Sequence, residues 1–144
     1  EVDSATYQGT GPILIVEDDD EVREPLKVWL SQRGVEIATA TSVFDAMEQL
    51  SGDYRIFLID LSLQEGDGLE LIQALKQRGN HGHICVMSSP DILAERAEEI
   101  QNAKVVQVFA KPLVMEEIEH FLARVERNPQ WATEPGPQGI AFAG

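Results

Sequence analysis

Short apolar runs along the chain alternate with longer stretches in which apolar residues recur every three or four positions. The first run covers residues 13–16, and apolar residues then follow at positions 22, 26, 29 and 30. A short apolar run predicts a buried strand, and the wider spacing predicts an amphipathic helix. The folded part of the chain is therefore predicted to begin as a strand followed by a helix.

The same strand-then-helix pattern occurs four more times. The later strands are expected at residues 35–39, 56–59, 84–87 and 105–109, each followed by an amphipathic stretch. The run at 56–59 is apolar throughout, as is typical of a central parallel strand buried on both faces. Single helices between strands imply right-handed crossovers, so the pattern predicts a doubly wound α/β domain, (βα)5, with a five-stranded parallel sheet.

Proline and glycine predict the limits of the first helix. Pro25 has no N–H to donate, so it is expected in the first turn of a helix that begins near Glu21 or Val22. Asp20 is then the predicted N-cap, and Gly34 is expected to end the helix.

Both ends of the chain lack apolar periodicity. Residues 1–12 and 128–144 contain Gly and Pro and are interpreted as linkers or tails, so the folded domain is predicted to cover residues 13–127. Because the chain begins at Glu1 and not at a methionine, we expect it to be a segment of something longer, with processing as the alternative.

Composition restricts the partners. The formal net charge of −14 would repel polyanions, so neither a nucleic acid nor a membrane is expected to bind directly, and the output must go through another protein or domain. No apolar stretch approaches the roughly 18 residues needed to cross a bilayer. The single cysteine, Cys85, lies in an apolar run and is expected to be buried and reduced, which predicts a cytoplasmic location.

Polar residues follow several of the predicted strands at their carboxyl ends, where α/β sheets bind ligands. Glu17 and Asp18 follow the first strand, Asp60 the third, Ser88 the fourth and Lys111 the fifth. Carboxylates that converge from separate strands repel one another unless a cation lies among them, and an all-oxygen, partly hydrated site suits Mg²⁺. The sequence therefore predicts a magnesium site at Glu17, Asp18 and Asp60.

This arrangement also predicts phosphoryl chemistry. An aspartate beside magnesium can attack phosphorus while an ammonium neutralises charge on the phosphoryl oxygens, which are the roles expected of Asp60 and Lys111. The Ser88 hydroxyl can bond a phosphate oxygen and is the expected detector of the phosphoryl group. Asp19 is the alternative to Asp18 at the magnesium site if the first strand ends one residue later.

Four motifs occur in one order along the chain: residues 13–18, Asp60 with Asp67-Gly68 beyond it, Ser88, and Lys111-Pro112. Together they resemble the receiver domains of response regulators over about residues 13–125. The resemblance implies a flavodoxin-like fold with strand order 2-1-3-4-5 and a cis Lys111-Pro112 bond. It also implies a phosphoacceptor of a two-component phosphorelay, which takes its phosphoryl group from a histidine kinase or histidine phosphotransfer protein and changes its affinity for an output domain or partner protein.

The resemblance further implies the role of each site residue. Asp18 and Asp60 would be direct Mg²⁺ ligands together with the carbonyl of Ser62, Glu17 would act mostly through water, and Lys111 would pair with the phosphate. Such a domain is not an enzyme with a separate substrate, because it catalyses only its own phosphorylation and dephosphorylation. A homodimer is compatible with it.

The chain departs from the usual pattern of the family at a few positions. Gln64 stands where a proline is usual, so the loop after the acceptor is expected to be less rigid, and Ser88 replaces a threonine. Residues 104–105 replace a small Gly-Ala pair. Val108 replaces the aromatic switch residue, and Phe109, displaced by one position, is expected to point to the opposite face of the sheet.

Other functions were weighed. A receiver that no longer switches would be a constitutive docking or dimerisation module, which the valine at position 108 favours. A flavin-binding flavodoxin needs a hydroxyl- and glycine-rich loop where this chain has acidic residues 17–20, and a haloacid-dehalogenase-type phosphatase needs an aspartate where Ser62 stands. His81 and His83 have no third ligand nearby and are expected at the surface.

Overall fold

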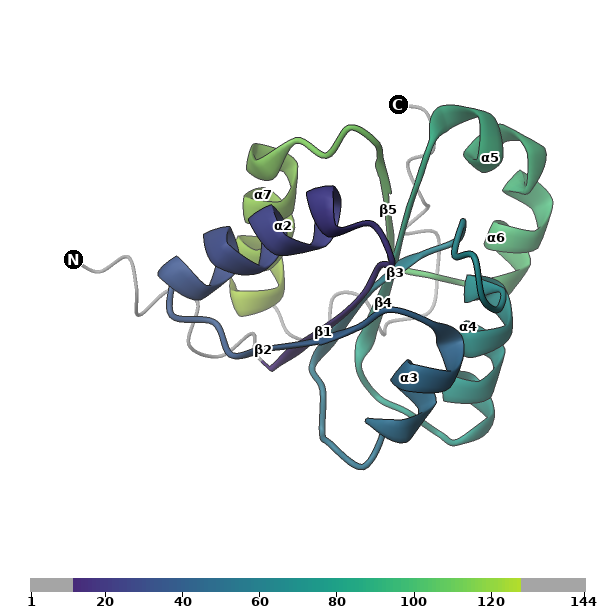
Figure 1. Cartoon of the computed structure of the whole chain (residues 1–144), viewed down its shortest axis with the longest axis horizontal. Helices are drawn as coiled ribbons and strands as arrows, with labels where there is room; N and C mark the ends of the chain where they lie inside the picture. Colours follow the sequence, from purple (N-terminus) through teal and green to yellow (C-terminus); the bar gives the residue numbers. More distant parts are fainter. Residues whose placement is uncertain (1–11, 128–144) are drawn as a thin grey trace.

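A parallel sheet forms the centre of the domain. The computed structural model of the 144-residue chain describes residues 12–127, so that the predicted tails lie, apart from Pro12, outside the described residues. The strands are β1 (Ile13–Val16), β2 (Ile37–Ala40), β3 (Ile56–Asp60), β4 (His83–Ser88) and β5 (Gln107–Ala110). Their order, β2-β1-β3-β4-β5, confirms the predicted strand order (Figure 1).

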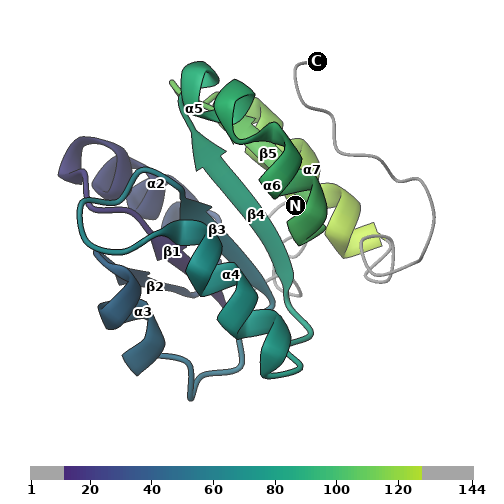
Figure 2. The same ribbon diagram turned by 90° about the vertical axis from the view of Figure 1, so that its right-hand side faces the viewer.

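Helices cover both faces of this sheet, which confirms the doubly wound architecture. One face packs against α2 (Asp20–Gln32) and α7 (Met115–Arg127). The other face packs against α3 (Val43–Glu48), α4 (Gly68–Gln77), α5 (Pro90–Glu95) and α6 (Ala97–Ala103), as Figures 1 and 2 show from two directions. The fourth unit thus contains two short helices where the sequence predicted one. None of the described helices combines the length and apolar character that a membrane span requires.

The strands send alternate side chains to opposite layers. In β1, Ile13 and Ile15 pack with α2 and α7, whereas Leu14 and Val16 pack with the opposite helices, and all four are fully buried. Burial of a side chain of this size contributes about 1.5–3 kcal/mol. A strand with two covered faces therefore requires a continuous apolar run. Packing against the helices on both faces of the sheet also fixes where each strand ends.

The same alternation in β5 separates Val108 from Phe109. Val108 packs on the α3–α6 face. Phe109 packs on the α2–α7 face, where its ring lies 6.0 Å from the ring of Phe121 in an edge-on arrangement. The structure confirms that Phe109 points away from the side on which Val108 lies.

The beginning of α2 differs from the prediction. Asp19 and not Asp20 is the N-cap, and its carboxylate accepts the N–H of Glu21 at 2.9 Å. Because the helix already begins at Asp20, Pro25 lies in the helix interior and not in the first turn. Without an N–H, Pro25 cannot donate the helical hydrogen bond to the carbonyl of Glu21. Pro25 lies on the exposed side of the helix. Gly34 follows the helix with a φ of 84°, as a terminating glycine should.

His83 also differs from the prediction, because it is not a surface residue. It is the first residue of β4 and only 5% exposed, and its Nδ1 lies 3.3 Å from the carbonyl of Arg55. A buried imidazole requires such a polar neighbour, and the strand end provides it. His81 is exposed and Cys85 is buried, as predicted.

An ion pair joins α4 to the junction between α5 and α6. Asp67 is the N-cap of α4, and its two carboxylate oxygens accept hydrogen bonds of 3.0 and 2.8 Å from the guanidinium of Arg96. The same carboxylate accepts the N–H of Leu69 at 3.0 Å. The hydrogen bonds from Arg96 hold the pKa of Asp67 below its ordinary value. This fork-shaped pair therefore favours the ionised carboxylate and orients the two short helices against α4.

We predict that Arg96→Ala lowers the free energy of unfolding by about 1 kcal/mol at pH 7, a value limited by the partial exposure of the pair. The folded-state pKa of Asp67 lies below the unfolded value, so the stabilisation is present above the unfolded pKa and is lost as the pH falls through the folded pKa. The difference between the two proteins should therefore shrink below about pH 4. Urea unfolding followed by circular dichroism measures both effects.

Arg78→Ala is the matched control, since Arg78 is exposed and has no ion pair within residues 12–127. Equal losses in the two variants at pH 7 would show that the bidentate pair adds no stability.

Candidate functional site

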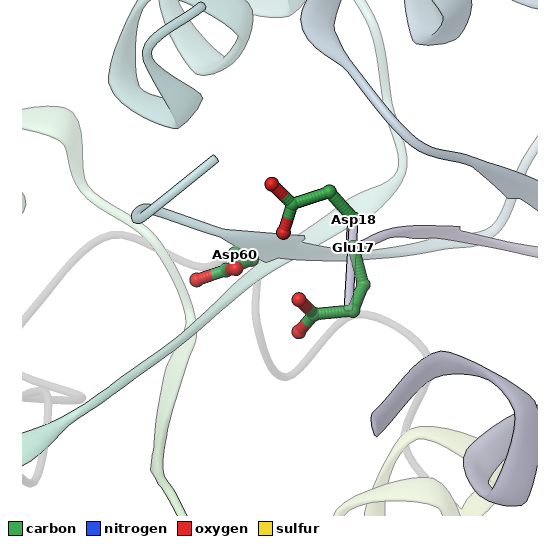
Figure 3. Close-up of side chains that lie close together, drawn as sticks. All are labelled: Glu17, Asp18 and Asp60. Atoms are coloured by element: carbon green, nitrogen blue, oxygen red, sulfur yellow. The ribbon is translucent and has the colours of Figure 1, made fainter. Parts of the chain in front are cut away.

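Three carboxylates meet at the carboxyl edge of the sheet. Glu17 and Asp18 directly follow β1, and Asp60 is the last residue of β3. The two strands are neighbours with Val16 paired to Ile59, so their ends coincide. One carboxylate oxygen from each of the three residues lies within 4.8 Å of the others, and Figure 3 shows the three side chains turned toward one common space.

Lys111 brings an ammonium to the same place. It directly follows β5, and its Nζ lies 2.7 Å from Glu17 Oε1 and 3.3 Å from Asp60 Oδ2. Its main-chain N–H donates to the carbonyl of Ser88 at 2.8 Å, and its bond to Pro112 is cis, as the resemblance implied. Burial alone would lower the pKa of Lys111, but the pairs with the two carboxylates outweigh it and raise the pKa. The ammonium is therefore held in its charged form.

Glu17 is the most constrained of the carboxylates. It is fully buried, and this burial raises its pKa to about 7, with the negative charge of Asp60 acting in the same direction and Lys111 opposing it. Oε2 accepts the N–H of Asp19 at 3.1 Å. Oε1 touches the Lys111 ammonium but makes no hydrogen bond of regular geometry within the described part of the chain. When all three carboxylates are ionised, the single ammonium leaves two negative charges uncompensated, so the ionised site favours an added cation.

Two hydroxyl groups lie beside the carboxylates. Ser88, the last residue of β4, is fully buried, and its Oγ lies 3.2 Å from Oγ of Ser62. The main-chain N–H of Ser62 donates to Asp60 Oδ1 at 2.9 Å. Sequence reasoning assigned Ser62 only a carbonyl role, and it missed the hydroxyl contact because nothing in the spacing indicates which hydroxyls meet across strands.

The loop between β3 and α4, residues 61–67, is anchored at both of its ends. Leu61 and Leu63 are buried in the core, while the residues between and after them face outward. Leu61 donates its N–H to the carbonyl of Met87 at 3.1 Å. At the far end of the loop, a Cβ on Gly68 would lie 2.5 Å from the carbonyl oxygen of Asp60, so the close approach of α4 to Asp60 requires glycine there.

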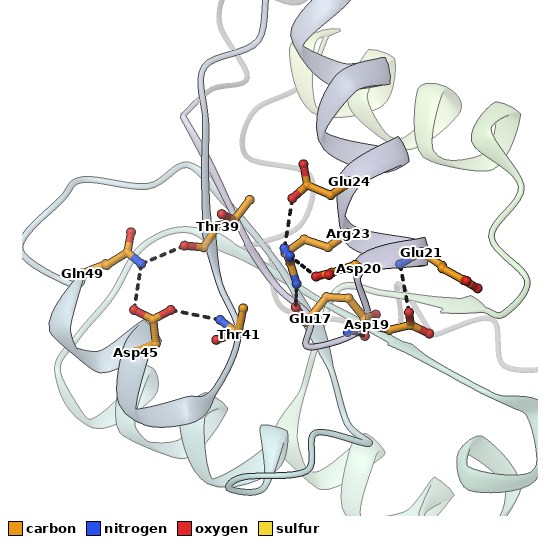
Figure 4. A network of polar contacts seen from close by, with 10 residues as sticks. All are labelled: Glu17, Asp19, Asp20, Glu21, Arg23, Glu24, Thr39, Thr41, Asp45 and Gln49. Atoms are coloured by element: carbon orange, nitrogen blue, oxygen red, sulfur yellow. Dashed lines mark hydrogen bonds and ion pairs between the residues drawn. The ribbon is translucent and has the colours of Figure 1, made fainter.

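Arg23 fixes the loop that carries Glu17 and Asp18. Its Nη1 donates to the carbonyl of Glu17 at 3.0 Å, and its guanidinium pairs with Asp20 and Glu24 (Figure 4). The side chain is 11% exposed. Sequence reasoning did not find this residue, although the three-residue spacing from Asp20 to Arg23 on a helix was a usable signal.

The sequence matches the family described as "Response regulator receiver domain" over residues 13–123. Response regulator MprA of Mycobacterium ulcerans (strain Agy99) is 32% identical over 131 residues, which are 90% of this chain and 56% of that protein. Regulator of RpoS of Escherichia coli (strain K12) is 30% identical over 102 residues, 70% of this chain and 30% of that protein. The chain thus spans about half the length, or less, of these curated relatives.

A solved structure shows the same fold. A sensor protein from Polaromonas sp. JS666 superposes with a TM-score of 0.71 at 29% identity, covering 81% of this chain and 95% of that chain.

We predict that Glu17→Gln stabilises the metal-free protein at pH 8 by on the order of 2 kcal/mol. The folded-state pKa of about 7 lies above the ordinary value of 4.5, so the wild type loses stability as the pH rises from about 4.5 to about 7. The advantage of the variant should therefore disappear toward pH 4.5. Urea unfolding in the presence of a chelator, at pH 5 and pH 8, measures this difference.

Added magnesium provides the control, because a cation needs the ionised carboxylate and should reverse the order of the two proteins at pH 8. A variant that is less stable than the wild type at pH 8 without metal would contradict the assigned burial cost.

Proposed function

Because the chain belongs to the response regulator receiver domain family, whose members work in two-component systems, we propose that Asp60 accepts a phosphoryl group from a phosphohistidine. The donor is a histidine kinase or a histidine phosphotransfer protein. The phosphorylated domain then changes its affinity for an output domain or partner protein. The observation that carries this proposal is the meeting of the Asp60 carboxylate with Glu17, Asp18 and the Lys111 ammonium.

The donor set fits Mg²⁺, the ion that receiver domains bind through acidic residues. All the donors are oxygens, two negative charges are uncompensated, and the buried Oε1 of Glu17 lacks a regular hydrogen bond in the described region. Asp18, Asp60 and the carbonyl of Ser62 would hold the ion, with Glu17 acting mostly through water. The ion would neutralise charge on the transferring phosphoryl group.

The chain's own residues perform the remaining work. A carboxylate oxygen of Asp60 forms a bond to phosphorus as the bond between phosphorus and the donor imidazole breaks, and the imidazole nitrogen leaves with the electron pair. Lys111, already 3.3 Å from Asp60 Oδ2, donates hydrogen bonds to the phosphoryl oxygens. The Ser88 hydroxyl exchanges its contact with Ser62 for a phosphoryl oxygen, so it registers whether the phosphoryl group is present.

A second function is supported by one observation on β5. Val108, buried in the core at the position of the family's usual aromatic, offers no ring that could move toward Ser88. A domain without such a switch would serve as a constitutive docking or dimerisation module. The two functions differ in whether phosphorylation changes the structure beyond the site.

We predict that acetyl phosphate with Mg²⁺ adds a single phosphoryl group to the wild type and none to Asp60→Asn, because the amide is not a nucleophile. Intact-mass measurement under acidic conditions reports the added group. Asp53→Asn, which alters an exposed aspartate, is the control and should be labelled like the wild type. Equal labelling of Asp60→Asn would remove Asp60 as the acceptor.

We predict that a phosphoryl mimic acts through Ser88 on the first turn of α5. Ser89 is the N-cap of α5, so the affected element is the start of this helix. One charge-assisted hydrogen bond, about 1.5–3 kcal/mol, is enough to shift a conformational equilibrium roughly tenfold or more. Beryllofluoride should change amide exchange at residues 88–95 and leave Val108 nearly unaffected.

Ser88→Ala should abolish this change while the aspartate still binds beryllofluoride. A wild type that binds the mimic without any change in amide exchange outside the site would favour the constitutive module. A strongest change at residues 105–109 that survives Ser88→Ala would contradict the proposed route.

A further inference from the structure

A main-chain N–H approaches each carboxylate of the site. Glu17 accepts from Asp19 at 3.1 Å, and Asp60 accepts from Ser62 at 2.9 Å. Both donors stand two residues after the acceptor, so these bonds are local. Asp18 Oδ2 accepts from Gln64 at 2.9 Å, and this donor is 46 residues away along the chain. Of the three bonds, it is the one that connects the loop after β1 to the loop after β3.

The residues on both sides of Gln64 hold its backbone in place. The buried side chain of Leu63 anchors it in the core, whereas the side chain of Gln64 is exposed. The next residue, Glu65, accepts the N–H of Val43 through its carbonyl at 3.4 Å. Gly66 has a φ of 95°, and a Cβ there would lie 2.6 Å from the Val43 side chain, so the loop turns tightly against α3. The N–H of Gln64 is therefore a positioned donor and not part of a freely moving loop.

Asp18 needs such a donor more than its neighbours do. It is half-buried, while Glu17 and Asp60 are buried and also touch the Lys111 ammonium. The repulsion from those two carboxylates would otherwise turn Asp18 toward solvent. With Oδ2 held by the amide, the side chain stays in the cluster and its second oxygen remains available to a cation.

We propose that the main-chain N–H of Gln64 is a positioning group for the magnesium site: it holds Asp18 in a metal-binding orientation before the ion arrives. This inference rests on the proposed function of Asp18 as a magnesium ligand. A partner that orients a metal ligand typically changes metal affinity by about 10- to 100-fold when it is removed. The residue type at position 64 contributes only through its backbone, so any residue except proline supplies the donor.

Two substitutions at one position separate the backbone from the side chain. Gln64→Pro removes the N–H, and Gln64→Ala keeps it while removing the side-chain amide. We expect Gln64→Pro to weaken Mg²⁺ binding about tenfold and Gln64→Ala to leave it unchanged, as measured by calorimetry or by Trp29 fluorescence. Magnesium affinity that is unchanged or tighter in Gln64→Pro would overturn the proposal, and so would an equal loss in both variants.

A proline can also disturb the loop through its ring, so a second variant removes the donor alone. Replacement of the Gln64 amide by an ester through semisynthesis deletes the N–H without adding a ring, and it should weaken Mg²⁺ binding like Gln64→Pro. An ester variant with wild-type affinity would overturn the proposal, whatever the proline variant does.

Amide exchange of Gln64 gives a readout independent of the metal. In the metal-free protein the amide should be protected, and Asp18→Ala should remove that protection; an unprotected wild-type amide would contradict the hydrogen bond.

The magnesium affinity of the same Asp18→Ala variant distinguishes a failure of the proposed function from a failure of the role assigned to Gln64. Unchanged magnesium affinity in Asp18→Ala would contradict the proposed function itself, whereas weakened affinity in Asp18→Ala with wild-type affinity in Gln64→Pro would overturn only the role of Gln64.

Discussion

The carboxyl edge of the sheet is constrained by three carboxylates that cannot move apart. The carboxylates of Glu17, Asp18 and Asp60 are attached to neighbouring strands whose register is set by apolar side chains in two helical layers. The repulsion among the carboxylates therefore cannot relax through the backbone without disturbing the core. Lys111 offsets one of the charges, whereas burial, with the charge of Asp60 acting in the same direction, raises the pKa of Glu17. The proposed cation binding and phosphoryl transfer both depend on the charge that Lys111 does not offset.

The features predicted from the sequence are those that depend on side-chain type and period. Apolar runs predict the strands, and the rule that parallel strands end at one edge of the sheet places Asp60 near Glu17 and Asp18. Phe109 and Val108 were assigned to opposite faces by the two-residue period of a strand alone. These predictions succeed because each depends on a pattern in which several residues indicate the same element or the same face.

The features that were missed depend on single residues or on the main chain. Asp19 and Asp20 are equally good capping residues, so the earlier helix start, which also places Pro25 beyond the first turn, had no signature. His83 was assigned to the surface because a strand can begin one residue before its apolar run. The N–H of Gln64 could not be found at all, since every residue but proline has one and only the folded loop directs it at Asp18.

The fourth crossover consists of two short helices, and this division affects how a binding protein can recognise the domain. α5 has six residues, of which Ile92 and Leu93 are only partly buried against the core, whereas α6 beyond the break at Arg96 is anchored by the fully buried Ile100. A segment that buries so little apolar surface opens at a small fraction of the free energy of global unfolding. If α5 opened before the sheet did, a binding protein that needs α5 folded would distinguish two states of the domain by their local order and not by a change of shape.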